Sequence, residues 1–150
     1  MTLHFAYGSN MSRARMRRCC GSAREIGTGV LEGYRFIITA DGYASVLPAP
    51  GGVVHGLVWR LTPRDLAALD AYESLDTGLY RAVTLPVRIG TARAAALVYV
   101  GRSRVAGRPR SGYLEEVLAA ARELRLPPAY VRALARWATG GSRAGGEAVA

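Results

Sequence analysis

Residues 5–11, FAYGSNM, end the first apolar run of the chain and lead into an arginine-rich segment. We predict a short strand over 2–6, then a turn, then a helix. Gly8 allows the backbone to turn sharply and to approach a ligand closely. Ser9 and Asn10 are residue types that cap helix N-termini. The turn is therefore expected to present backbone N–H groups at the positive end of a helix, where a carboxylate or an oxyanion binds.

The composition is that of a single globular domain. The chain has 150 residues, half of them hydrophobic, which is enough for a substantial core. We assign the domain to residues 1–139 and predict a disordered tail over 140–150, which has two Gly-Gly pairs and no apolar periodicity. The sequence contains no apolar run of about 18 residues and no recognisable signal peptide. We therefore expect a cytoplasmic protein that does not enter a membrane.

Positive charge is high but dispersed. The net charge is +9, and all 20 basic residues are arginine. The two densest groups are Arg13, Arg15, Arg17 and Arg18, and Arg102, Arg104, Arg108 and Arg110. Aromatic residues do not alternate with the first group, as a stacking platform for nucleic acid requires. We expect no nucleic-acid partner and interpret most of this charge as solvated surface that weakly attracts acidic substrates.

The two cysteines, Cys19 and Cys20, are adjacent, and the two histidines, His4 and His55, are far apart in sequence. Adjacent cysteines rarely form a structural disulfide, and two thiols do not complete a four-ligand zinc site. We predict reduced thiols and no metal site.

The first half of the sequence has short apolar segments separated by turn residues, which is typical of a curved or closed sheet. After a helix from 11 or 12 to 18, the predicted strands cover 24–31, 33–39, 43–47 and 53–61. Turns are expected at Glu32-Gly33 and Gly51-Gly52, with prolines ending the third strand.

Helices and one hairpin are predicted in the second half. Thr62 and Pro63 have the types expected for an N-cap and a first helical residue. Strands over 80–89 and 92–100 form a hairpin around Gly90. Further helices are predicted over 111–125 and from 127 to 137. The Gly-, Arg- and Pro-rich loop 101–112 is long enough to act as a flap over a site.

Three segments in order resemble the gamma-glutamylcyclotransferase family. They are FAYGSNM at 5–11, LDAYE at 69–73 with GLYR at 78–81, and PRSGY at 109–113 with RLPPAY at 125–130. Together they span most of the chain, roughly residues 3 to 137. The resemblance implies an α+β fold, with a small mixed barrel-like sheet and flanking helices.

The implied reaction is the attack of a γ-glutamyl α-amino group on its own γ-carbonyl, which yields 5-oxoproline and a free amine. Nucleophile and electrophile lie in one molecule, so orientation contributes much of the catalysis and no cofactor is needed. The resemblance assigns the proton transfers to Glu73, at the end of a helix among apolar neighbours. Burial would raise the pKa of this carboxyl towards neutrality and favour proton transfer in both directions.

The substrate contacts implied by the resemblance are Tyr7, Gly8, Ser9, Asn10, Tyr80 and Tyr113. The 7–10 turn would bind a substrate oxygen through its N–H groups, and the last two tyrosines would donate hydroxyl hydrogen bonds. Tyr7 also fits a core position. We expect Asp70 on the surface, and we place Tyr43 outside the site.

Several alternatives stay open. The glutathione-specific branch typically has Leu at the position of Asn10, so this residue favours γ-glutamyl amino acids or amines as substrates. The same cyclisation could instead remove a γ-glutamyl protecting group from a biosynthetic intermediate. A non-catalytic module that binds a small ligand is a further alternative. The expected partner is a small γ-glutamyl compound, and a homodimer is left open.

Overall fold

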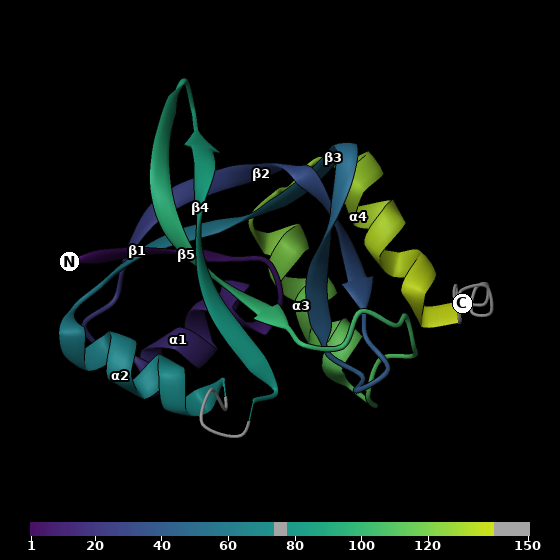
Figure 1. The fold of residues 1–150 in the computed structure, drawn as a ribbon, viewed down its shortest axis with the longest axis horizontal. Coiled ribbons are helices and arrows are strands. Elements are labelled where there is room, and N and C mark those ends of the chain that lie inside the picture. The colour runs from purple at the N-terminus through teal and green to yellow at the C-terminus, as the bar shows by residue number, and fades with distance from the viewer. Residues whose placement is uncertain (74–77, 140–150) are drawn as a thin grey trace.

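The computed structural model describes residues 1–73 and 78–139 and contains a closed five-stranded barrel (Figure 1). The strands are β1 (Thr2–Ala6), β2 (Arg24–Ile38), β3 (Ala44–Leu61), β4 (Tyr80–Ile89) and β5 (Ala92–Gly101). Their order around the barrel is β1-β3-β2-β4-β5, and the closing pair, β1 and β5, is parallel while the other pairs are antiparallel. The predicted α+β fold with a mixed barrel-like sheet is confirmed.

β2 and β3 are longer than predicted, because each passes through a point where we expected a turn. Glu32 pairs with Val53 and Tyr34 pairs with Pro48, so residues 49–52 lie opposite Gly33 alone. The positive φ of Gly33, 84°, accommodates this irregularity. A bulge bends a paired strand without ending it, and closing a small barrel requires such bends. The turns predicted at 32–33 and 51–52 are therefore corners within continuous strands.

Helices cover two sides of the barrel. They are η1 (Ser9–Met11), α1 (Arg13–Cys19), α2 (Pro63–Tyr72), α3 (Tyr113–Glu123), α4 (Pro128–Ala135) and η3 (Arg136–Thr139). Figure 1 shows α1 and α2 together on one side and α3 and α4 on the other, with the β4–β5 hairpin projecting from the body. The predicted hairpin around Gly90 is confirmed, with Ile89 paired to Ala92.

The capping prediction for the N-terminal turn is wrong in its residues. The hydroxyl of Ser12 accepts a hydrogen bond from Arg15 N (3.2 Å) and caps α1. Ser9 and Asn10 instead form the short 3-10 turn η1 between β1 and α1. This extra turn leaves room for Asn10 to point into the protein, where only 5% of it is exposed.

The start of α2 is fixed by its local sequence. Asp65 N donates to the Thr62 hydroxyl (3.1 Å), and the Asp65 carboxylate accepts from Thr62 N (3.0 Å), which completes a capping box. The same carboxylate accepts a bond from Ser22 N (3.3 Å) and so ties α2 to the segment after α1. Leu69 of α2 is fully buried, and Glu73 is the C-cap residue of α2.

The loop 101–112 is attached to the barrel along its length. Gly107 N donates to Ile38 O (2.8 Å), Ala40 N donates to Val105 O (2.8 Å), and Arg110 N donates to Gly42 O (3.1 Å). These bonds join the loop to the end of β2 and the residues that follow it. The backbone is therefore held in place in this structure, unlike a free flap.

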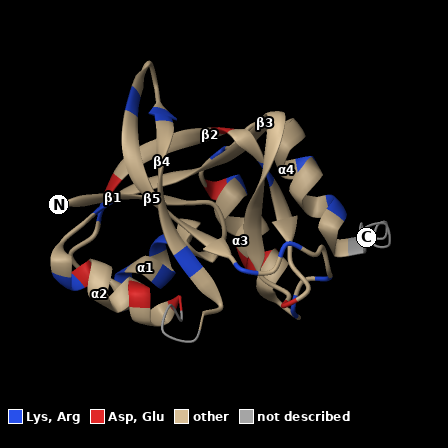
Figure 2. Cartoon of the chain, viewed as in Figure 1, with Lys and Arg blue, Asp and Glu red and all other residues tan. Residues whose placement is uncertain are grey.

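Arginines are spread over helices, hairpin and loops (Figure 2), as a dispersed charge predicts. Within residues 1–73 and 78–139, no helix combines the length and apolar character needed to cross a membrane. The predicted tail, 140–150, lies outside the described residues.

Candidate active site

A cavity of about 330 Å³ opens where β1 ends and β3 and β4 begin. All seven residues predicted for the site line it: Tyr7, Gly8, Ser9, Asn10, Glu73, Tyr80 and Tyr113. They come from the turn after β1, from η1, from the C-cap of α2, and from the first residues of β4 and α3. Segments far apart in sequence therefore meet around one small space.

Glu73 is held at this cavity by Asn10. Asn10 Nδ2 donates a hydrogen bond to Glu73 Oε2 (2.8 Å) across 63 residues of sequence. Burial raises the pKa of Glu73 from 4.5 to about 7, although the Asn10 hydrogen bond and the positive charge of Arg15 act to lower it. A carboxyl group with a pKa near neutrality can both accept and release a proton at physiological pH.

Asn10 is itself held in place by hydrogen bonds of its backbone and its side chain. Its backbone oxygen accepts a hydrogen bond from Trp59 Nε1 (3.0 Å), and its side chain is bound to Glu73. Its Oδ1 atom is buried and has no hydrogen-bond partner among the described residues. A buried acceptor of this kind at a cavity wall is suited to a donor on a bound ligand.

The turn at Gly8 brings backbone close to the cavity. Met11 N and Ser12 N donate to Gly8 O (3.1 Å) and Ser9 O (3.0 Å), and the Ser9 backbone interacts with the Tyr113 hydroxyl. A Cβ atom on Gly8 would lie 2.9 Å from the Tyr113 hydroxyl oxygen. Glycine at this position therefore avoids a close contact with the Tyr113 hydroxyl.

The three predicted tyrosines differ in what their hydroxyl groups do. Tyr7 donates to Tyr99 O (2.5 Å), and Tyr80 donates to Ala44 O (2.7 Å). Both hydroxyl protons are therefore already used in hydrogen bonds to the backbone. The Tyr113 hydroxyl accepts from Ala44 N (3.2 Å) and also interacts with Ser9. Burial raises the pKa of Tyr113 to about 12, which keeps it protonated. Tyr113 is thus the best placed of the three to contact a ligand.

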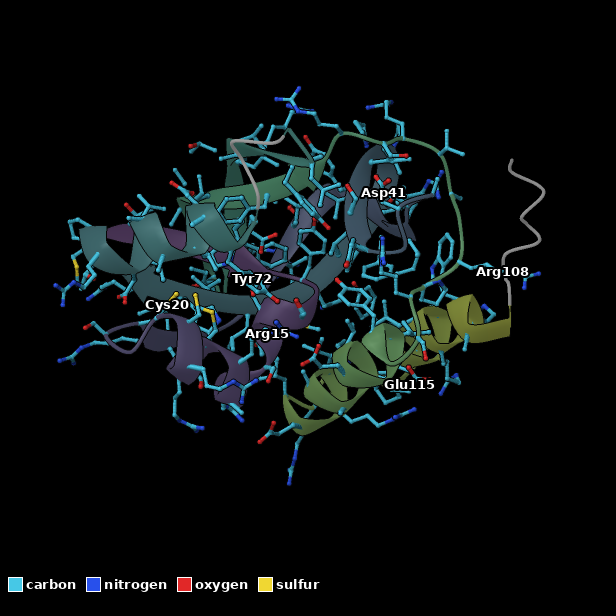
Figure 3. The ribbon with its side chains drawn as sticks, turned by 90° about the horizontal axis from the view of Figure 1, so that it is seen from below. Arg15, Cys20, Asp41, Tyr72, Arg108 and Glu115 are labelled. Atoms are coloured by element: carbon cyan, nitrogen blue, oxygen red, sulfur yellow. The ribbon has the colours of Figure 1, made fainter. Side chains whose placement is uncertain are left out.

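Sequence reasoning missed Arg15, which we had expected to be solvated. It lines the cavity from α1, and its Nη2 donates to both carboxylate oxygens of Glu116 on α3 (2.8 and 3.0 Å). Its guanidinium carbon lies 5.3 Å from the ring centroid of Tyr72, and Figure 3 shows these two labelled side chains meeting between α1 and α2. The available signal was its position next to the apolar Met16, at the border of the inward face of α1.

Tyr43, which we had placed outside the site, also lines the cavity. Its ring packs edge-on against Tyr113, with 5.3 Å between centroids, and Arg110 lies over it at 5.0 Å. Nothing in its local sequence distinguishes it from a strand residue, because the contact with α3 spans 70 residues.

Two further cavity residues, His4 and Tyr99, lie in adjacent strands with ring centroids 5.4 Å apart. Burial lowers the pKa of His4 to about 4, so this side chain is neutral at physiological pH. The Tyr99 hydroxyl donates to Asp70 Oδ1 (2.5 Å). Asp70 is therefore a half-buried partner of β5 instead of a surface residue, and it fastens the last turns of α2 against the barrel.

No cluster of three or more metal-ligating side chains occurs among the described residues. Cys19 and Cys20 are both free thiols. Burial raises the pKa of Cys20 to about 12, which makes its thiol a poor nucleophile.

Comparison with known proteins identifies the family. The family model described as gamma-glutamyl cyclotransferase, AIG2-like, matches residues 4–117. The chain belongs to this family. Among curated relatives in the family, the gamma-glutamylcyclotransferase of Mus musculus is 26% identical over 141 residues, which cover 85% of this chain and 74% of the mouse protein.

Solved structures share the same fold. A structure named gamma-glutamyl cyclotransferase has a TM-score of 0.83 at 23% identity and covers 89% of this chain and 86% of its own. YkqA from Bacillus subtilis has a TM-score of 0.80 at 27% identity, over 92% of this chain and 54% of its own length. The barrel and its helices are therefore the fold of this family.

Proposed function

We propose that this protein is a gamma-glutamylcyclotransferase, which converts a γ-glutamyl amino acid or γ-glutamyl amine into 5-oxoproline and the free amine. The observation that carries the proposal is the pairing of Glu73 with Asn10 at the cavity (2.8 Å), with a pKa near 7 for Glu73. The family membership and the 26% identity to the mouse enzyme support the same reaction class.

The reaction moves protons from the attacking nitrogen to the departing nitrogen, and one carboxyl group can both take and return them. Ionised Glu73 takes a proton from the α-ammonium of the γ-glutamyl group, and the freed amine attacks the γ-carbonyl carbon. The C–N bond of the new ring forms as the carbonyl oxygen gains negative charge. When that intermediate collapses, protonated Glu73 returns the proton to the departing nitrogen, and the old amide bond breaks. The ring nitrogen gives its remaining extra proton to the released amine by way of Glu73, so the products are the neutral lactam and an ammonium ion. The carboxylate is regenerated at the end of the cycle.

Asn10 has two roles in this scheme. Its Nδ2 holds one oxygen of Glu73 in a fixed position, which leaves the other oxygen for the substrate. Its unpartnered Oδ1 can accept a hydrogen bond from the substrate ammonium. Two acceptors on adjacent side chains would orient the nucleophilic nitrogen before attack, and such orientation can supply several kcal/mol of the barrier.

The turn after β1 would stabilise the developing negative charge. The first N–H groups of a helical turn generally lack acceptors within that turn, and Gly8 lets the backbone approach a ligand. A preorganised donor to an oxyanion typically contributes about 3–4 kcal/mol. The protonated hydroxyl of Tyr113 is a further donor at the same wall of the cavity.

The test is release of 5-oxoproline from γ-glutamyl amino acids, γ-glutamyl amines and glutathione by the wild type and by Glu73→Gln. Glutamine keeps the shape of the side chain but cannot shuttle a proton, so turnover should fall below detection. Glu115→Gln on the exposed side of α3 is the matched control and should retain full activity. Activity retained by Glu73→Gln would remove this residue from its role. If no compound releases 5-oxoproline, the protein is not a general cyclotransferase, and calorimetric titration would test ligand binding.

A further inference from the structure

Arg15 is the one described residue lining the cavity that carries a positive charge at neutral pH, because His4 is neutral there. The side chain is 24% exposed, so it stands between the buried part of the cavity and solvent. A cation at this position is not required for the proton transfers assigned to Glu73. Its charge therefore needs a separate explanation.

The guanidinium of Arg15 is held rigidly from two sides. Glu116 on α3 binds Nη2 (2.8 and 3.0 Å), and Tyr72 on α2 lies against the guanidinium plane at 5.3 Å (Figure 3). The Nε atom is buried and has no hydrogen-bond partner among the described residues. Buried donors are nearly always paired in folded proteins, so an unpaired one at a cavity indicates a ligand that supplies the acceptor. Arginine recognises carboxylates in particular.

We infer that Arg15 binds the carboxylate of the departing amino acid and makes the protein selective for γ-glutamyl amino acids over γ-glutamyl amines. This inference rests on the proposed function. The γ-glutamyl group must lie near Glu73 and Asn10, of which Asn10 is only 5% exposed. The departing group therefore extends outwards, and Tyr72, which stacks on Arg15, is 46% exposed at that side.

The size of the cavity agrees with a substrate of this kind. Its volume, about 330 Å³, is at the lower end of the range for ligand pockets, which suits a compound the size of a dipeptide. The arginines of loop 101–112 are not among the residues that line it. Selectivity for an acidic leaving group is therefore assigned to α1 instead of to that loop.

The experiment compares γ-glutamylalanine with γ-glutamylethylamine, two substrates whose leaving groups differ only by a carboxylate. The wild type, Arg15→Gln and Arg18→Gln are assayed at about pH 9, where Glu73 is ionised because its pKa is near 7. Arg18 is exposed on the same helix, so its replacement removes the same charge at a matched site. The measured quantity is the ratio of kcat/KM values for the two substrates, which cancels effects on Glu73 itself.

We expect the wild type to favour γ-glutamylalanine by roughly 10- to 100-fold, the range for a hydrogen bond to a charged group. Arg15→Gln should bring the ratio close to one by lowering kcat/KM for γ-glutamylalanine, and Arg18→Gln should keep the wild-type ratio. Equal losses on both substrates in Arg15→Gln would overturn the inference, because Arg15 would then serve the γ-glutamyl group or the fold. A wild-type ratio near one would also overturn it, whether or not the variant folds.

The two proposals fail in different ways. If the wild type releases 5-oxoproline from both substrates without preference, the proposed function stands and only the role of Arg15 is wrong. If it releases none from either, the proposed function is wrong. Calorimetric affinities of the wild type for the two compounds would then test the role of Arg15 independently. Equal affinities would count against carboxylate binding by Arg15, and tighter binding of γ-glutamylalanine would support it.

Discussion

Replacing Glu73 with Gln should stabilise the protein at alkaline pH while removing its activity. Burial raises the pKa of Glu73 from 4.5 to about 7, so the folded protein holds this proton more tightly than the unfolded chain does. The stability due to the bound proton is complete below pH 4.5 and is lost as pH rises to 7. Each pKa unit corresponds to about 1.4 kcal/mol, so ionising Glu73 costs the fold about 3 kcal/mol. Glutamine never ionises and avoids this cost.

The assay is urea unfolding of the wild type and Glu73→Gln at pH 5 and pH 8, with the difference between their free energies of unfolding as the readout. Taking the difference cancels every other titrating group that the substitution leaves unchanged. We expect Glu73→Gln to gain about 2–3 kcal/mol relative to the wild type between the two pH values. A difference that stays constant across this range would refute the reasoning, because Glu73 would then titrate in the fold as it does in water.

The pH dependence of kcat/KM follows from the same pKa, so kcat/KM should fall as pH drops below about 7. Asn10→Ala should move this acidic limb of the pH profile to higher pH, because the Asn10 hydrogen bond lowers the pKa of Glu73. An unchanged limb would mean that this bond does not act on the carboxyl group. Gly8→Ala should impair activity, because its Cβ would lie 2.9 Å from the Tyr113 hydroxyl, and adding Tyr113→Phe should restore part of the substrate affinity in a double-mutant cycle. Purely additive losses would exclude that clash. Tyr99→Phe should lower the free energy of unfolding by about 1–3 kcal/mol, because it leaves a carboxylate on α2 without its hydrogen bond. Thermal unfolding would measure this, and an unchanged transition would show that the bond adds no stability.

Elements with strong local signals could be predicted from the sequence. Thr62 and Pro63 start α2 because capping depends on residues within one turn. Gly90 joins β4 to β5 because a positive φ is needed there and glycine adopts it freely. The seven proposed site residues came from the family resemblance, and the structure gathers them around one cavity.

Other features depended on contacts between distant segments. β2 and β3 continue through their glycine and proline corners, because pairing across the barrel compensates for poor local strand propensity. Asp70 was expected on the surface. Its hydrogen-bond partner, Tyr99, comes from β5 and cannot be predicted from the residues next to Asp70 in sequence.

The chemical groups that are available can be read from the sequence: a carboxyl group, a glycine-containing turn, tyrosines and an excess of arginine. How those groups act on one another depends on the folded structure. The raised pKa of Glu73 comes from burial, and the position of Arg15 comes from its contacts with Glu116 and Tyr72 on two other helices. Desolvation and charge interactions depend on distance in space, and folding brings together residues that the chain separates by up to about a hundred positions.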